Sequence, residues 1–160
     1  MIKEMLTHDT IEVNVHAENW EEAVQLAGNL LLKKDCIEQC YIDNMIKIVK
    51  EIGPYIVLLK GIALAHARPE HGSKAIGLSL ITLDTPVEFG DELNDPVSLV
   101  FALSAIDNSS HIDLISEMGM MFEDESRIQR LMDCKTKDEI LAFIDSVIEE
   151  NEIASQKLMS

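Results

Sequence analysis

The chain has 160 residues, 47% of them hydrophobic, which is enough to bury a sizeable core in a single domain. With 29 acidic and 13 basic residues, its formal net charge is -16. That balance argues against a nucleic-acid-binding protein, which needs a basic face, and against docking on an anionic membrane.

Cysteines and chain segments indicate the compartment. The three cysteines lack the spacing of a disulfide framework, which favours reduced thiols. The first residues, MIKEMLTHDT, lack the apolar core of a signal peptide. The longest apolar run, Val97–Ile106, is interrupted by serines and is too short to span a bilayer. We therefore expect a cytoplasmic protein without direct membrane insertion.

The first part of the chain predicts a strand and two helices. Apolar and polar residues alternate over Ile11–Val15, as in a strand with one buried face. Asn19 and Glu22 have the spacing of a capping box, and apolar residues at helical spacing follow them. A second helix begins after a break at Asp35 and stops before Gly53-Pro54.

The middle of the chain predicts buried strands. Tyr55–Leu59, Ala75–Leu83 and Val97–Ser104 are apolar runs rich in strand-forming residues. Asp84-Thr-Pro86 predicts a turn, and the acidic stretch Glu88–Asp95 predicts a loop.

Three helices are expected next. Asp107-Asn-Ser-Ser110 is a dense group of helix-start residues, and a short helical piece follows over Asp124–Met132. Thr136-Lys-Asp-Glu139 is a capping box that opens a last helix. For the helix behind Ser110 we expect an inner side made of Ile112, Ile115, Met118, Gly119 and Phe122.

The predicted order of elements is β-α-α-β-β-β-α-α-α. A few internal strands with enough helices to cover both faces predict an α+β fold, a three-layer α/β/α sandwich on a mixed sheet of about four to five strands. We expect one domain over residues 1–150. The apolar pattern ends at Asn151, so residues 151–160 are expected to fray.

Two histidines stand out by position. His66 lies in Leu58–Gly72, a polar segment between apolar runs that we interpret as a surface loop. His111 lies at a helix start, where unpaired amides attract anions, phosphate included. Neutral imidazole is a good nucleophile near pH 7, so one histidine could accept a phosphoryl group while the other donates hydrogen bonds to its oxygens. The spacing leaves open whether the two meet.

Other interpretations of these residues remain open. Arg68 could bind phosphate, or could pair with nearby Glu70, Glu88 or Asp91. His71 is expected to be a loop residue that aids solubility or positioning.

A metal hydrolase is the competing class of enzyme. It would have to assemble His66, His71, His111 and Asp113 from distant segments, and no H-E-x-x-H element is present. The sequence also lacks the G-x-S-x-G elbow of serine hydrolases and a phosphate-binding P-loop.

Several stretches, taken in order, carry a family resemblance: Trp20–Val24, Gly53–Tyr55, Gly61–Gly72, Thr82–Phe89, Asn94–Val97 and Phe122–Asp124. Together they resemble the enzyme IIA component of the bacterial phosphoenolpyruvate-dependent sugar phosphotransferase system, in the mannitol–fructose class. The ascorbate-specific branch is the nearest, and the resemblance covers nearly the whole chain.

The resemblance implies a phosphotransferase. In the family motif G-[IL]-A-x-x-H-x-R-P-E, the histidine is phosphorylated, and it corresponds to His66. The implied donor is the histidine phosphocarrier protein and the implied acceptor is a cysteine of an enzyme IIB, which serves a membrane component IIC. His111 would hydrogen-bond the phosphoryl group. No metal or organic cofactor is implied.

This chain departs from its relatives beside the nucleophile. Ala65 and Ala67 stand where the family usually has Pro and Gly, which changes the stiffness of the backbone there. The alternative function is therefore a regulatory domain of the same fold, which senses phosphorylation without feeding a transporter.

Overall fold

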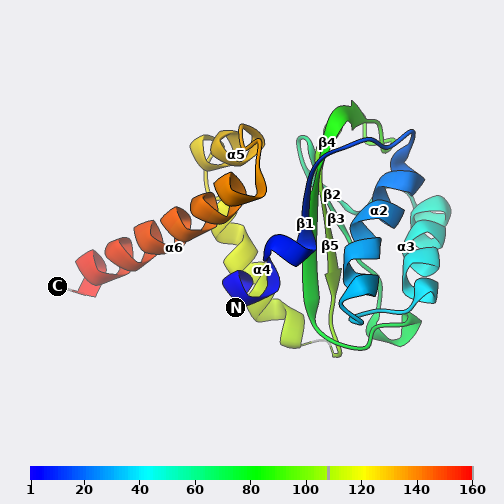
Figure 1. Cartoon of the computed structure of the whole chain (residues 1–160), viewed down its shortest axis with the longest axis horizontal. Helices are drawn as coiled ribbons and strands as arrows, with labels where there is room; N and C mark the ends of the chain where they lie inside the picture. Colours follow the sequence, from blue (N-terminus) through cyan, green and yellow to red (C-terminus); the bar gives the residue numbers. More distant parts are fainter. Residues whose placement is uncertain (108, 160) are drawn as a thin grey trace.

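The computed structural model describes residues 1–107 and 109–159 as a three-layer molecule with a central sheet (Figure 1). Helices α2 and α3 cover one face of the sheet, and α1, α4, α5 and α6 lie on the other side. The elements in chain order are α1 (Ile2–Met5), β1 (Ile11–Val15), α2 (Trp20–Lys33), α3 (Gln39–Ile52), β2 (Val57–Leu59), β3 (Ile62–Ala65), β4 (Gly77–Val87), β5 (Val97–Ser104), α4 (Ser110–Met121), α5 (Glu125–Met132) and α6 (Lys137–Met159). Two short 3-10 helices, η1 (His8–Thr10) and η2 (Pro69–His71), complete the list.

The sheet is mixed and has five strands in the order β1-β4-β5-β3-β2. Strand β1 runs parallel to β4, and β3 runs parallel to β5, whereas β4–β5 and β2–β3 are antiparallel pairs. The predicted α+β sandwich on a mixed sheet is confirmed. The structure adds a short N-terminal helix and one more strand, β3.

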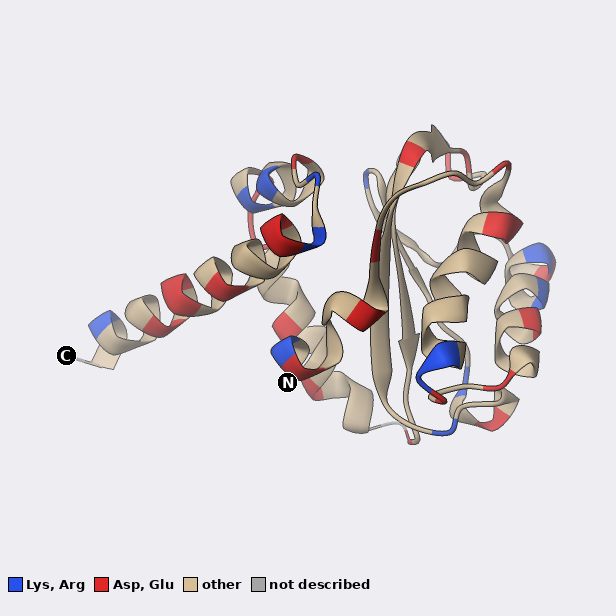
Figure 2. Cartoon of the chain, in the orientation of Figure 1, with Lys and Arg blue, Asp and Glu red and all other residues tan. Residues whose placement is uncertain are grey.

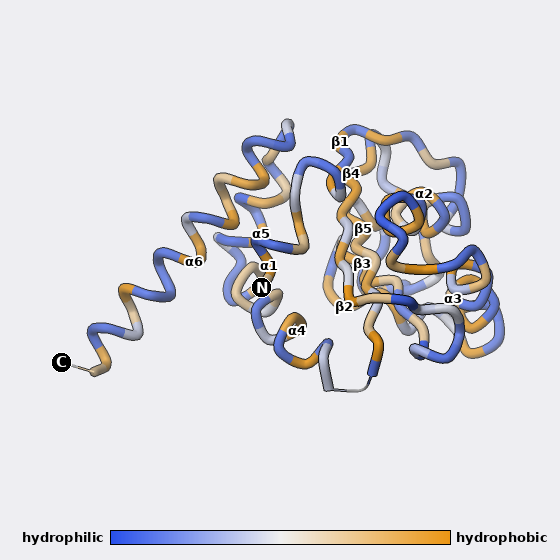
Figure 3. Tube along the Cα trace, turned by 60° about the horizontal axis from the view of Figure 1, so that its bottom comes forward, coloured by the Kyte–Doolittle hydropathy of each residue, from blue (hydrophilic) through white to orange (hydrophobic). Residues whose placement is uncertain are grey.

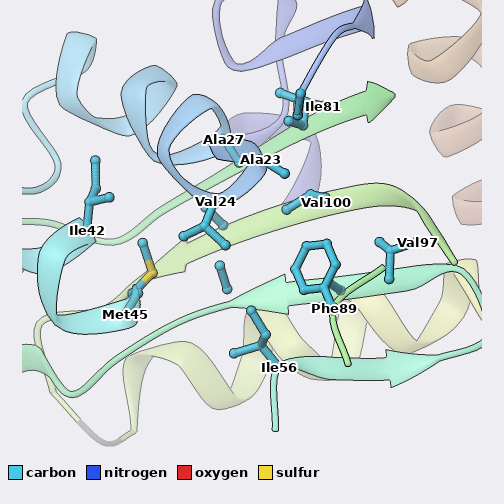
Figure 4. Close-up of a cluster of buried hydrophobic side chains, with 14 of the residues drawn as sticks. Ala23, Val24, Ala27, Ile42, Met45, Ile56, Ile81, Phe89, Val97 and Val100 are labelled. Atoms are coloured by element: carbon cyan, nitrogen blue, oxygen red, sulfur yellow. The ribbon is translucent and has the colours of Figure 1, made fainter. Parts of the chain in front are cut away.

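The sheet separates two apolar cores, because successive strand residues face opposite sides. In β3, Ala63 and Ala65 face α2 and α3, while Ile62 and Leu64 face α4 and α6. The small alanines allow α2 and α3 to pack closely over the sheet, where Ile42 and Met45 fill the space (Figure 4). Figure 3 shows β3 and β5 as largely hydrophobic segments between the two layers.

Two predictions in the strand region are wrong. Ile62–Ala65 was expected to be part of a loop but forms the buried strand β3. The turn expected at Asp84-Thr-Pro86 lies inside β4, which continues to Val87. Its pairing with β1 ends at Leu83 and its register with β5 shifts before Val87, so Pro86 removes no ladder hydrogen bond there.

The expected inner side of α4 is also wrong in part. Ile112 is 55% exposed and Ile115 is 42% exposed, while Leu114, Met118 and Met121 are buried. Met118 is buried as expected, and Phe122, the C-cap residue of α4, packs against the same core with its ring edge to face with Phe101 at 5.8 Å. Asn108, in the expected helix-start group, lies outside the described residues.

The last helix runs beyond the body of the molecule (Figure 1). Its last buried residue is Val147, and residues 152–159 are all exposed although helical. The loss of apolar pattern at Asn151 therefore marks where α6 leaves the core, not where the helix ends. Acidic residues are spread over the helices of both layers (Figure 2). Across residues 1–107 and 109–159, no helix is long and apolar enough to cross a membrane.

Candidate functional site

The parallel pairing of β3 and β5 brings the two candidate histidines together. Ala65 lies opposite Ala102, so the segments that leave the carboxyl ends of these strands start side by side. His66 follows β3 directly, and His111 lies in the first turn of α4, which follows β5. Both line one pocket of about 570 Å³. Burial is the main cause that lowers the pKa of His66, and the nearby His111 lowers it further.

Hydrogen bonding selects one tautomer of His66. Its Nδ1 lies 2.8 Å from the carbonyl oxygen of Leu64. Because a carbonyl can only accept, Nδ1 carries the proton, and Nε2 has a free lone pair. Burial lowers the pKa of His66, whereas the hydrogen bond to the Leu64 carbonyl raises it by favouring the protonated ring. The effect of burial is the larger, so the pKa lies below its ordinary value. The site therefore holds a neutral imidazole with an unprotonated Nε2.

Two tyrosines fix the backbone around His66. The Tyr55 hydroxyl donates to the carbonyl oxygen of His66 at 2.6 Å, and the two rings meet edge to face at 5.2 Å. The backbone N–H of Ala67 donates to the Tyr41 hydroxyl at 3.0 Å. Sequence patterns place Tyr41 on the apolar face of a helix and Tyr55 in a strand, and neither pattern indicates what the hydroxyl does.

His111 also presents one free ring nitrogen. Its Nδ1 lies 3.4 Å from the carbonyl oxygen of Asp107, so Nδ1–H donates there and Nε2 remains available. The Asp107 carboxylate accepts from the backbone N–H of Ser110 at 2.6 Å and of Ser109 at 3.0 Å. These bonds lower the pKa of Asp107, the one from Ser110 most. These hydrogen bonds to Asp107 hold the turn that leads into α4 and carries His111.

Arg68 and His71 have different environments in the structure: Arg68 belongs to the pocket lining and His71 does not. Arg68 lines the pocket, and none of the carboxylates suggested as its partners pairs with its guanidinium in the described part of the chain. His71 is not among the residues that line the pocket. Its carbonyl oxygen accepts from Asn44 Nδ2 at 3.2 Å, and its Nδ1 is buried with no hydrogen-bond partner among the described residues.

The walls of the pocket are apolar, a feature that the sequence analysis missed. They include Ile48, Ile52, Leu58 and Ile115. Ile52 is 69% exposed and Leu58 is 45% exposed, so the rim presents apolar side chains to solvent. An exposed apolar patch around a reactive group is typical of a protein docking surface. Helical spacing had assigned Ile115 to the core, and nothing in the spacing distinguishes a core stripe from a docking stripe.

The four residues of the competing hydrolase hypothesis are not assembled. Among residues 1–107 and 109–159, no group of three His, Cys, Asp or Glu side chains is placed to hold a metal ion.

Comparison with known proteins places this geometry in one family. Residues 4–147 match the family described as the phosphoenolpyruvate-dependent sugar phosphotransferase system, EIIA 2. The ascorbate-specific PTS system EIIA component of Escherichia coli K12 is 39% identical over 137 residues, which cover 85% of this chain and 89% of that protein. The corresponding component of Salmonella typhimurium is 38% identical over 139 residues, 86% of this chain and 90% of that protein.

Solved structures agree with the sequence relatives. The solution structure of a mannitol-specific cryptic phosphotransferase enzyme IIA from Escherichia coli superposes with a TM-score of 0.82 at 30% identity, covering 89% of this chain and 97% of that one. A complex of the mannitol enzyme IIA with phosphorylated enzyme IIB, also from Escherichia coli, matches with a TM-score of 0.76 at 28% identity, covering 88% and 97%.

The resemblance read from the sequence is thereby confirmed, for the family and for its ascorbate-specific branch. Components of this kind are phosphotransferases that work through a phosphohistidine intermediate. With the match spanning most of its length, the chain belongs to the EIIA type 2 family of the phosphoenolpyruvate-dependent sugar phosphotransferase system.

Proposed function

We propose that His66 is the residue that carries the phosphoryl group, and that Nε2 is the atom that accepts it. The observation that supports this most strongly is the hydrogen bond from Nδ1 to the Leu64 carbonyl, which leaves Nε2 unprotonated. Because burial lowers the pKa of His66 from its ordinary value of 6.5, the ring is neutral and nucleophilic at neutral pH.

In each transfer step, one bond to phosphorus forms while another breaks, and no cofactor is required. The Nε2 lone pair forms a bond to phosphorus while the phosphorus–nitrogen bond of the donor phosphohistidine breaks, and the electron pair returns to the donor ring. The phosphorylated His66 ring keeps its Nδ1 proton and becomes cationic, and the Leu64 carbonyl stabilises this charge. A cysteine thiolate of enzyme IIB then attacks phosphorus, and His66 returns to the neutral form. Such transfers depend mainly on positioning and charge stabilisation.

His111 and Arg68 are proposed to stabilise the charge on the phosphoryl oxygens. Once protonated, Nε2 of His111 can donate a hydrogen bond to the group on His66, since the two residues share one pocket. Arg68 brings a guanidinium to the same pocket in a chain with a net charge of -16. Without these cations, a phosphate held in an apolar pocket would be costly.

The proposed partners follow from the relatives. The solved complex of the mannitol enzyme IIA with phosphorylated enzyme IIB supports an enzyme IIB as acceptor for this chain. We propose the histidine phosphocarrier protein as donor and a membrane component IIC as the indirect beneficiary. The exposed rim residues Ile52 and Leu58 would contact both soluble partners in turn. Since those exchanges take place in the cytoplasm, we propose the same location for this protein.

Ascorbate is the sugar that the comparisons favour. The relatives at 38–39% identity are ascorbate-specific, whereas the mannitol-type structures match at 28–30%. Discharge of the phosphorylated chain to an ascorbate-type IIB should therefore be faster than discharge to a mannitol-type IIB. Equal or reversed rates would contradict this assignment of the substrate.

The site assignment is tested by labelling with phosphoenolpyruvate, enzyme I and the phosphocarrier. We expect acid-labile phosphate on the wild type and on the control His71→Ala, and none on His66→Ala. Full labelling of His66→Ala, or an unlabelled wild type, would sink the proposal. A label that no IIB removes would instead favour the regulatory alternative.

A further inference from the structure

We propose that Tyr41 is a positioning residue that holds the segment of His66 at a fixed place relative to the strand that leads to His111. Its hydroxyl joins the backbone of Ala67, directly after the nucleophile, to the backbone of Leu103 near the end of β5. The inference rests on the proposed role of His66 and adds how the two halves of the pocket are kept together.

The geometry around the hydroxyl is specific. Tyr41 lies in the first turn of α3 and is 1% exposed. Its oxygen accepts from the Ala67 N–H at 3.0 Å and lies 2.7 Å from the Leu103 carbonyl oxygen, against 3.1 Å from that of Ala67. A phenol has one proton, so it donates to the nearer Leu103 oxygen. Burial raises the pKa of Tyr41 to about 12, so this proton is retained at neutral pH.

The segment beyond His66 depends on such side-chain bonds. Strand β3 ends at Ala65, and residues 67–72 are hydrogen-bonded to the N-terminal half of α3 and to its N-cap residue Glu38. The backbone N–H of Glu38 donates to the Gly72 carbonyl at 2.9 Å, and Asn44 donates to that of His71. Both bonds tie the segment to the helix layer. Across the described residues, the Tyr41 hydroxyl makes the only hydrogen-bonded link from residues 67–72 to β5.

This link explains how the site tolerates its departures from the family motif. Ala65 and Ala67 provide neither the stiffness of Pro nor the conformational freedom of Gly. A buried hydroxyl bonded to the backbone of Ala67 restricts that segment in their place. Because Leu103 precedes the loop to α4, a shift at Tyr41 would change the separation of His66 and His111.

The test is Tyr41→Phe, which keeps the ring and removes the oxygen. In single-turnover transfer from phosphorylated phosphocarrier, we expect the rate at saturation to fall about 10–100-fold, since a misplacement of about 1 Å can cost about 100-fold. The half-saturating phosphocarrier concentration should stay within about twofold, because the docking rim is unchanged. An unchanged rate in the folded variant would overturn the proposal.

Ser79→Ala is the matched control for lost stability. The Ser79 hydroxyl is also fully buried and donates to the Ala27 carbonyl at 2.7 Å, between β4 and α2 and outside the pocket lining. Removing it should weaken folding in the same way as Tyr41→Phe and leave the transfer rate at the wild-type value. If Ser79→Ala slows transfer as much as Tyr41→Phe, the effect is general destabilisation and the proposal fails.

A double-mutant cycle tests the link to His111. If Tyr41 acts by holding the two histidines in place, its removal should matter much less in a His111→Ala background, with a residual effect of about twofold. Full additivity of the two effects would contradict the proposal.

Two further measurements keep the outcomes distinct. If His66→Ala is still labelled, the proposed function itself is refuted. If His66→Ala is not labelled but Tyr41→Phe transfers phosphate at the wild-type rate, only the role of Tyr41 is refuted. If Tyr41→Phe does not fold, NMR of the wild type decides. The Tyr41 hydroxyl proton should exchange slowly and lie close to the Ala67 amide before and after phosphorylation, and loss of that proximity on phosphorylation would overturn the proposal.

Discussion

Gly72 ends the His66 segment in close contact with α3, and replacing it tests that packing. Its φ of +123° is a conformation that L side chains rarely adopt. A Cβ added there would lie 2.7 Å from Cys40 Sγ and 3.0 Å from the backbone nitrogen of Tyr41. The Cys40 side chain can rotate away, but the helix backbone cannot. Gly72→Ala should therefore cost both backbone strain and a steric shift of the first turn of α3.

A matched variant, Gly90→Ala, separates the cost of backbone strain from the cost of steric overlap. Gly90 has a similar φ of +94°, and a Cβ there would meet nothing within 4 Å. Gly90→Ala should cost only the backbone strain, about 1–3 kcal/mol. Gly72→Ala should cost that amount and about 1–3 kcal/mol more for overpacking. Because Tyr41 would move with the helix turn, only Gly72→Ala should also slow phosphoryl transfer.

The assay is equilibrium unfolding in urea, read by far-UV circular dichroism. An additional loss of about 1–3 kcal/mol corresponds to a midpoint lower by about 1 M for a urea dependence of about 1–3 kcal/mol per molar. Equal losses of stability in Gly72→Ala and Gly90→Ala would refute the tight contact with α3. A wild-type transfer rate in Gly72→Ala would refute its connection to the site.

Three other predictions follow from the site and from α6. Because burial lowers the pKa of His66, its NMR titration should have a midpoint below 6.5, and the neutral nucleophilic ring should be lost as pH drops through that midpoint; a midpoint above 6.5 would contradict the burial. His111→Ala should slow transfer by about 100-fold while His66 is still labelled, and an unchanged rate would mean that His111 does not act on the phosphoryl group. Deletion of residues 151–160 should change the free energy of unfolding by less than about 0.5 kcal/mol, because the end of α6 is exposed; a larger loss, measured by urea unfolding, would mean that a domain of residues 1–150 is incomplete.

The layers of the fold could be predicted, but β3 could not. Alternation in Ile11–Val15 and the cap at Asn19 depend on local chemistry, and both elements begin where the sequence indicates. Strand β3 has only four residues, Ile62–Ala65, and two of them are alanines with low strand propensity. It is a strand because β2 and β5 pair with it on both sides, which is information from distant parts of the chain.

The residues of the candidate site could be predicted from the sequence only in part, for the same reason. His66 and His111 could be selected by residue type and local position. Their closeness depends on the parallel pairing of β3 with β5, which could not be predicted because β3 itself was not predicted. The sequence of α4 offers two apolar stripes, and only the packing of its partners decides that Leu114 is buried while Ile115 faces the pocket. The hydroxyl of Tyr41 has no sequence signal, because its partners are backbone atoms.

The atom that carries the phosphate tests the central claim most directly. The protein with ¹⁵N-labelled histidine would be phosphorylated through the phosphocarrier and studied by ¹⁵N and ³¹P NMR. The geometry predicts phosphorus bonded to Nε2 of His66, with the proton retained on Nδ1 and donated to Leu64. Phosphorus on Nδ1 of His66, or on another histidine such as His71, would contradict it.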